Sequence, residues 1–323
     1  MQKQCKNQRF LCISIVCLLL LAGLVAGCTT TTSQPTPLPP GTTVTPLPTT
    51  PASLQISKTT TTTAMPSKTT AASVTATPVP NYTPSEKTLI VYTAASLKGV
   101  SGKLGTEFSK AYPGHTAIFN LDGTQALKTQ IENGAYADVF ISASNSYTNT
   151  LKSEGYFINS TVKPLTTNYV IVILPASNPG SIKSLSDLAT PGRKIAMAAS
   201  NVPVGTATYA ALANLAKSTY SQDWNRSVFS NVVTYETSEP GVATKVSLGE
   251  VDAGFVYEST YNVALPGTLT AITIPKADNY LQIYTIGVIQ QTRNSGVAQE
   301  FEDFMLSSVG QQILKDYGFR PVS

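Results

Sequence analysis

The sequence predicts an α/β protein with largely parallel sheets, because short apolar, β-branched segments alternate with segments of helical periodicity. Residues 89–93 have the composition of a buried strand, and the apolar residues from Leu97 to Tyr112 recur at helical spacing. Ser96 stands where this strand ends and the helix begins. A hydroxyl at that place can bind an anion together with unpaired backbone N–H groups, or it can simply cap the helix.

The same alternation continues to the end of the chain. Further strands are expected at residues 117–121, 139–143, 169–174, 194–198, 232–235, 253–257, 269–274 and 284–289. Helices are expected at residues 124–133, from 144 to about 154, from 184, and at 206–217, 242–248 and 295–317.

The N-terminus has the features of a secretory leader. Three basic residues and no acid precede an apolar run at residues 10–25, which is short for a membrane-spanning helix. Cys28 follows Val-Ala-Gly in a pattern that resembles the lipobox of bacterial and archaeal lipoproteins. We therefore expect residues 1–27 to be a signal peptide and Cys28 to be lipidated; an ordinary signal peptide and a retained anchor are the alternatives. In each case we expect the domain to lie outside the cytoplasm, and lipidation of Cys28 or a retained leader would anchor it to the outer face of the cytoplasmic membrane.

The next segment, residues 28–87, consists mainly of Thr, Ser, Pro and Ala. It offers too few large apolar side chains to offset the entropy of ordering, so we expect a disordered spacer. The four cysteines all lie within residues 1–28. The domain at residues 88–323 therefore has no disulfide, no thiolate nucleophile and no cysteine metal ligand.

Charge and histidine content exclude several classes of function. Loss of the leader removes three of 22 basic residues and none of 18 acidic residues, which lowers the net charge from +4 to about +1. That balance does not suit a nucleic-acid-binding surface. The lone His115 argues against zinc chemistry and a Ser-His-Asp triad. We expect neither an enzyme nor a resident metal or cofactor.

Four predicted strand-to-helix junctions carry hydroxyls, small residues or acids. They are the segments at residues 95–96, 122–124, 202–206 and 238–241. Ligands of open α/β sheets bind beyond the carboxyl ends of the strands, where these junctions converge. The pattern therefore predicts a ligand cleft.

Five segments in a fixed order resemble the periplasmic molybdate/tungstate-binding proteins of ABC transporters. They are YTAASL, DGTQALKTQIENGAYADVFISAS, NVPVGTATYAAL, VSLGEVDAGFVY and FEDFMLSSVGQQILKDYGF, and the resemblance covers essentially residues 89–319. The resemblance implies the type II periplasmic-binding fold, with two α/β lobes, a cleft and crossover strands near residues 166–170 and 272–284.

In that fold one lobe would comprise about residues 88–167 and 280–323, and the other about residues 168–279. The resemblance implies a monomeric receptor that captures molybdate or tungstate, closes on it, and delivers it to a membrane permease and its ATPase.

The resemblance also implies which residues bind the oxyanion. The family's binding serine corresponds to Ser96, and its second hydroxyl falls on Thr124. Val204 would give a backbone N–H, and the Tyr257 phenol would donate to an anion oxygen. The alternatives are that Thr124 is only a helix cap, Val204 only a turn residue and Tyr257 a core phenol.

The chain departs from the family pattern at Glu239. The position whose backbone N–H binds the anion in the family carries an acidic side chain in this sequence. Its side chain could point away and stabilise the helix N-terminus. It could coordinate the metal, as carboxylates do in the archaeal binders that the chain resembles more distantly. A register shift by one residue would place Ser238 there instead.

Other functions stay open from the sequence. The site could bind another oxyanion such as sulfate, or the Thr/Pro-rich stalk could present a surface sensor or adhesion domain without a transport role. An enzyme on the same fold would have only Glu239 and Tyr257 as candidate acid–base groups.

Overall fold

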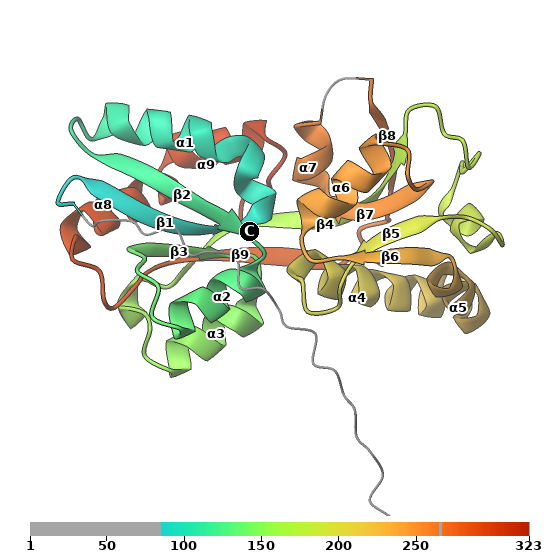
Figure 1. Cartoon of the computed structure of the whole chain (residues 1–323), viewed down its shortest axis with the longest axis horizontal. Helices are drawn as coiled ribbons and strands as arrows, with labels where there is room; N and C mark the ends of the chain where they lie inside the picture. Colours follow the sequence, from blue (N-terminus) through green and yellow to red (C-terminus); the bar gives the residue numbers. More distant parts are fainter. Residues whose placement is uncertain (1–84, 265–266, 323) are drawn as a thin grey trace, which may run out of the picture. The chain divides into compact units, whose positions relative to one another are not determined.

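The computed structural model describes residues 85–264 and 267–322, and within these ranges nine strands form one mixed sheet (Figure 1). The strands are β1 (Thr88–Ala94), β2 (Thr116–Asp122), β3 (Val139–Ser142), β4 (Lys163–Pro175), β5 (Ile195–Ala198), β6 (Val232–Glu236), β7 (Ala253–Tyr257), β8 (Leu269–Thr273) and β9 (Leu281–Val288). Their order is β2-β1-β3-β9-β4-β7-β5-β6, and β8 pairs with β4.

Helices cover both faces of this sheet. They are α1 (Lys98–Ala111), α2 (Thr124–Glu132), α3 (Asn145–Ser153), α4 (Pro203–Ser218), α5 (Gln222–Ser230), α6 (Glu239–Ser247), α7 (Glu258–Asn262), α8 (Ser295–Leu306) and α9 (Ser308–Asp316), with 3-10 turns η1 (Ala95–Leu97), η2 (Asn159–Thr161) and η3 (Leu185–Ala189). Over β1–β3, α1, α8 and α9 lie on one face, and α2 and α3 on the other (Figure 1). Over β5–β7, α6 and α7 lie opposite α4 and α5 (Figure 1).

Two groups of parallel strands define two lobes. The first lobe contains β2, β1 and β3, and the second contains β6, β5 and β7 together with β8. The antiparallel strands β4 and β9 pass between them: β4 pairs with β9 as far as Tyr169 and with β7 from Val170 onward. The chain thus crosses between the lobes in β4 and β9 (Figure 1). The residue boundaries predicted for the lobes stay a prediction.

The buried core follows the periodicities read from the sequence. Val100, Leu104 and Phe108 of α1 are all at most 1% exposed. Phe108 meets Phe301 of α8 edge to face, with ring centroids 5.1 Å apart. Such a pair stabilises the fold by about 0.5–1.5 kcal/mol beyond the burial of its area. α1 and α8 are far apart in the sequence but pack against each other on one face of the first lobe.

The predicted strands are confirmed at their expected places, but several helices differ from the prediction. α6 begins at Glu239 rather than Val242, and the helix expected from residue 184 is the 3-10 turn η3. α4 begins at Pro203 rather than Thr206, because proline at the first helical position has a suitable φ and no N–H to leave unpaired. The predicted helix at residues 295–317 is two helices that meet at Ser307. Ser307 is extended, and its Oγ accepts from the N–H of Gly310 and thereby caps α9.

Two helices were not predicted. α5 is capped by Ser221, whose Oγ accepts from the N–H of Trp224. α7 has only five residues and too short an apolar pattern to be seen. The predicted leader at residues 1–27, Cys28 and all of the predicted spacer except residues 85–87 lie outside the described residues. Within the described ranges no helix has the length and apolar content needed to cross a membrane.

Candidate functional site

A small cavity between the lobes collects all five residues that the sequence singled out. Its volume is about 20 Å³, far below the roughly 300–1,000 Å³ of pockets for organic ligands. The lining residues are Ala94, Ala95, Ser96, Gly123, Thr124, Ala143, Val202, Pro203, Val204, Glu239 and Tyr257. The cavity therefore has the scale of a small inorganic ion.

Strand register explains why distant residues meet here. β1 and β2 are parallel and in register up to the pair Ala94 and Asp122, so the residues that follow, including Ser96 and Thr124, emerge side by side. In the second lobe β5 and β6 end in register at Ala198 and Glu236. The turns into α4 and α6 therefore start from the same edge of the sheet.

Each helix that begins at the cavity lacks a side-chain cap. In the described part of the chain, the N-cap residues of η1, α1, α2, α4 and α6 make no side-chain hydrogen bond to the first turn. By contrast, serines cap α3, α5 and α9, which begin elsewhere. Helix N-termini present unpaired N–H groups and the positive end of the helix dipole. The amides at the cavity are therefore open to an anionic ligand.

The hydroxyl of Thr124 is oriented by the backbone. Thr124 is the first residue of α2 and is 1% exposed, and its Oγ1 accepts from the N–H of Ala143 at 3.1 Å. That bond occupies the oxygen as an acceptor and leaves the hydroxyl proton to be donated.

Ser96 is held from the crossover strand β9. Its Oγ lies 2.8 Å from the phenol oxygen of Tyr284, and either group can be the donor. Tyr284 is fully buried. Sequence reasoning missed Tyr284, because a tyrosine in an apolar strand carries no local signal of a partner 188 residues away.

Val204 contributes main chain rather than side chain. It is the second residue of α4, where no intrahelical acceptor is available to its N–H, while its side chain belongs to the apolar core. Gly205 allows this close approach, because a Cβ there would lie 2.0 Å from the carbonyl oxygen of Ala199. The turn into α4 can therefore present its backbone N–H groups to the cavity without a side chain in the way.

The phenol of Tyr257 is buried at the end of β7. Its O–H donates to Gln282 Oε1 at 3.2 Å, and its ring lies edge-on to Tyr284 with centroids 6.0 Å apart. Burial raises the pKa of Tyr257 well above its ordinary value, so the phenol stays neutral and can donate. In this structure its acceptor is Gln282, a partner that sequence reasoning did not identify.

Glu239 is almost completely buried in the cavity wall. It is 3% exposed, and its Oε1 accepts from the N–H of Tyr257 and from the hydroxyl of Thr260, both at 2.7 Å. Burial raises the pKa of Glu239 to about 7. Its Oε2 has no hydrogen-bond partner among the described residues. Ser238, the alternative by register, is the N-cap residue of α6 and does not line the cavity.

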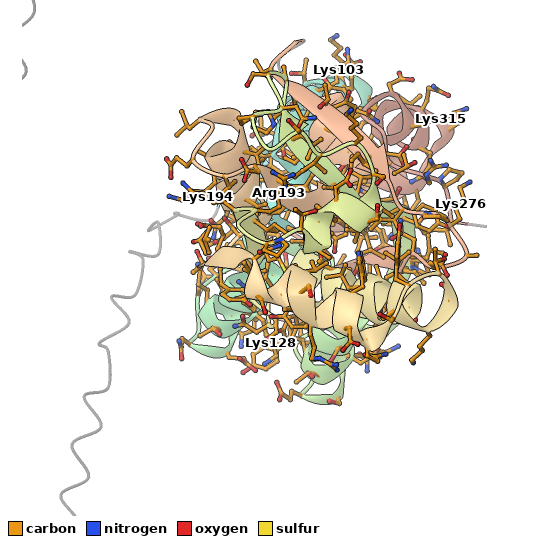
Figure 2. All side chains as sticks on the ribbon, turned by 90° about the vertical axis from the view of Figure 1, so that its right-hand side faces the viewer. Lys103, Lys128, Arg193, Lys194, Lys276 and Lys315 are labelled. Atoms are coloured by element: carbon orange, nitrogen blue, oxygen red, sulfur yellow. The ribbon has the colours of Figure 1, made fainter. Side chains whose placement is uncertain are left out.

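Cationic side chains take no part in the described lining of the cavity. Figure 2 labels six of them, Lys103, Lys128, Arg193, Lys194, Lys276 and Lys315, distributed over the domain, and none of the six is a lining residue. Any anion bound here would therefore be held by amides and hydroxyls.

Two hydrogen bonds close the lobes over the cavity. Gln125 of α2 donates through Nε2 to the carbonyl of Thr237 at 2.9 Å. Tyr147 of α3 donates through its phenol to the carbonyl of Asn201 at 2.6 Å. Both join a first-lobe helix to a second-lobe loop, so the structure represents a closed arrangement.

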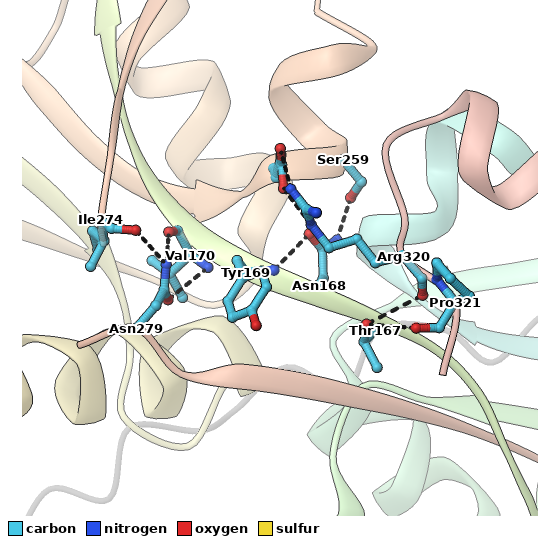
Figure 3. A network of polar contacts seen from close by, with 10 residues as sticks. Thr167, Asn168, Tyr169, Val170, Ser259, Ile274, Asn279, Arg320 and Pro321 are labelled. Carbon is cyan, nitrogen blue, oxygen red and sulfur yellow. Dashed lines mark hydrogen bonds and ion pairs between the residues drawn. The ribbon is translucent and has the colours of Figure 1, made fainter. Parts of the chain in front are cut away.

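The crossover strands are fastened by the network in Figure 3. Thr167 and Arg320 exchange backbone hydrogen bonds of 2.7 and 2.9 Å. These bonds hold the C-terminal segment of the chain against β4. The Arg320 guanidinium pairs with Glu258 of α7, and Asn168 donates to Ser259 of the same helix at 2.8 Å. α7 thus joins the crossover to Glu239, whose carboxylate Thr260 holds.

Comparison with known proteins identifies the family. The sequence pattern of the family described as bacterial extracellular solute-binding proteins matches residues 89–320, so the chain belongs to this family. A curated relative, the molybdate-binding protein ModA of Mycobacterium tuberculosis, is 29% identical over 237 residues, which cover 73% of this chain and 86% of the relative.

Solved structures share the fold. The periplasmic molybdate-binding protein of Azotobacter vinelandii matches with a TM-score of 0.63 at 22% identity, over 73% of this chain and all of that one. The sulfate-binding protein SubI of Mycobacterium tuberculosis matches with a TM-score of 0.65 at 16% identity, over 73% and 88%. The predicted two-lobed α/β solute-binding fold is confirmed. Family membership makes the chain an extracytoplasmic binding protein rather than an enzyme.

Proposed function

We propose that this protein is the substrate receptor of an ABC transporter, and that its cavity binds molybdate or tungstate for delivery to a membrane permease and its ATPase. The observation that carries the proposal is the donor set: uncapped helix N-termini and neutral hydroxyls surround an ion-sized cavity. The named function of the Mycobacterium tuberculosis relative supports the choice of ligand.

In this proposal five residues bind the oxyanion. Ser96 and Thr124 donate from hydroxyls, and Val204 and Glu239 donate from backbone N–H groups at the start of α4 and α6. Tyr257 donates once its O–H turns from Gln282 to the anion. A micromolar ligand requires about 8 kcal/mol, and each hydrogen bond to a charged group contributes roughly 1.5–3 kcal/mol. Five such donors supply this free energy of binding before the costs of desolvation and of lost translational and rotational entropy are subtracted. Further amides in the first turns of the same helices add to it.

Neutral donors also select among anions. Phosphate retains a proton near neutral pH and needs an acceptor for it, whereas molybdate, tungstate and sulfate are fully deprotonated. Cavity size must then separate the larger metal oxyanions from sulfate. The permease would recognise the closed form, in which both lobes contribute to one surface.

We propose further that Cys28 carries a lipid, that residues 28–87 form the spacer, and that residues 88–323 work as a monomer. Mass spectrometry of the membrane fraction should find a lipid on Cys28, and Cys28→Ala should release the domain. Retention of that variant on membranes would contradict the proposed anchor.

Competitive calorimetric titration of the mature chain tests the ligand. Molybdate and tungstate should bind with one site per chain and a Kd of about 1 μM or below, and sulfate and phosphate should bind far more weakly. If none of the four binds below about 100 μM, the proposal is wrong. Tight binding of sulfate alone would identify a sulfate receptor instead.

A further inference from the structure

Glu239 is the single acidic side chain among the described lining residues of the cavity. Its two oxygens have different surroundings. Oε1 accepts two hydrogen bonds of 2.7 Å, from the Tyr257 N–H and the Thr260 hydroxyl. Oε2 is buried without a partner in the described part of the chain. A buried carboxylate oxygen without a donor is costly if it is charged and acceptable if it carries a proton.

Among the residues that the structure describes, no Lys or Arg lines the cavity beside Glu239. The phenols of Tyr257 and Tyr284 are close enough for the carboxylate to raise their pKa values further, beyond the effect of burial. On β6, Glu236 accepts from Thr234.

Charged groups on the remaining neighbours are occupied or exposed. Glu258 of α7 pairs with Arg320, Lys98 of α1 is exposed, and Lys245 of α6 pairs with Glu250. None of these groups is among the causes of the raised pKa of Glu239. Charge neutralisation by a side chain is therefore not available to the carboxylate.

We propose that Glu239 binds the oxyanion in its protonated form, with Oε2–H as a further donor, so that capture of one dianion is accompanied by uptake of up to one proton. This inference rests on the proposed function. An ionised Glu239 would place a third negative charge in a dehydrated cavity that contains a dianion and no cation. Protonation removes that repulsion and makes every polar group that faces the ligand a donor.

The direction of the pH dependence follows from linkage. Burial raises the pKa of Glu239 to about 7 before any ligand is present, and a dianion nearby raises it further. Below pH 7 the proton is already in place, and affinity should not depend on pH. Above pH 7 binding must take up the proton, and affinity should fall about tenfold per pH unit until the pKa of the complex is reached. Molybdate does not itself titrate in this range.

Protonated Glu239 also accounts for selectivity. An ionised Oε2 would accept the proton of hydrogen phosphate and make that anion a ligand. When Oε2 is protonated, the O–H of hydrogen phosphate faces only donor groups of the protein and finds no acceptor. The protonation state of one side chain therefore determines which class of oxyanion the cavity accepts.

Calorimetry on the mature chain tests the inference directly. Molybdate is titrated between pH 6 and 9 in pairs of buffers with different ionisation enthalpies, which measures the protons taken up per ion bound. We expect uptake to approach one proton above pH 7 and to vanish near pH 6. In Glu239→Gln the amide keeps the acceptor for Tyr257 and Thr260 and replaces Oε2–H with an N–H.

This variant should bind without proton uptake at any pH, and at pH 9 it should bind more tightly than the wild type, by up to about 100-fold. Glu236→Gln, outside the cavity, is the matched control and should keep the pH profile of the wild type. The wild-type proton count stands by itself if the variant does not fold.

Three results would overturn the inference. They are wild-type affinity independent of pH with no proton uptake, loss of binding at every pH in Glu239→Gln, and tight binding of phosphate near pH 6, where the carboxyl is protonated. The second, with a Mo-edge absorption spectrum showing more than four ligands, would mean that the carboxylate coordinates the metal. Failure of wild type to bind any oxyanion at pH 6 would instead refute the proposed function.

Discussion

Thr124 allows a prediction in which binding and stability can be separated. Its Oγ1 accepts from the buried N–H of Ala143, and its hydroxyl proton is left for the ligand. Thr124→Val preserves the shape of the side chain and removes both interactions. The lost bond to a charged ligand is worth roughly 1.5–3 kcal/mol, which corresponds to a Kd weakened about 10- to 150-fold.

The same substitution leaves the Ala143 N–H buried without a partner. That costs about 1–3 kcal/mol of stability, and each kcal/mol lowers the Tm of a domain of this size by about 2–4 °C. Thr124→Ser is the control, because it keeps the hydroxyl and should remain within a few-fold of wild type in Kd. Calorimetry and thermal denaturation measure the two effects independently. A Thr124→Val protein that binds molybdate within twofold of wild type would refute the assigned donor role.

Three further predictions concern other parts of the molecule. Gly205→Ala should lower the Tm in thermal denaturation, because its Cβ would collide with the Ala199 carbonyl, whereas Gly296→Ala, with open space around it, should not. Tyr147→Phe removes a bond between the lobes and should speed ligand release roughly 2- to 12-fold in stopped-flow measurements; an unchanged rate would contradict its closing role. Ligand-free Glu239→Gln should be more stable than wild type at pH 8 by up to about 3 kcal/mol in urea unfolding, because the raised pKa makes wild-type stability fall between about pH 4.5 and pH 7. Equal free energies of unfolding for the two proteins at pH 8 would show that ionisation of Glu239 does not destabilise the folded protein.

The sequence was sufficient to predict the strands and most helices of the fold. Period and composition identify β1, β4 and β7, and the order of the motifs brings Ser96, Thr124, Val204, Glu239 and Tyr257 to one cavity. The strands follow from local pattern, and the convergence of the junctions follows from the rule that parallel strands end at a common edge. The choice of the five site residues depended on the resemblance to the molybdate- and tungstate-binding family.

The partners of those residues could not be predicted. Tyr284 contacts Ser96 across 188 positions, and Gln282 accepts from Tyr257 because β4 and β9 cross between the lobes. The orientation of the Glu239 carboxylate depends on the hydrogen bond from Thr260 of α7. α7 has only five residues, too few to show a helical pattern in the sequence. Long-range side-chain contacts arise from topology, which local periodicity does not encode.

The most direct test of the central claim is a crystal structure of the mature chain grown with molybdate. We expect the metal ion's density in the cavity between the lobes, with the hydroxyls of Ser96 and Thr124 and the amide of Val204 within hydrogen-bond distance of its oxygens. Density elsewhere, or an ion that Ser96 and Thr124 do not share, would contradict the account.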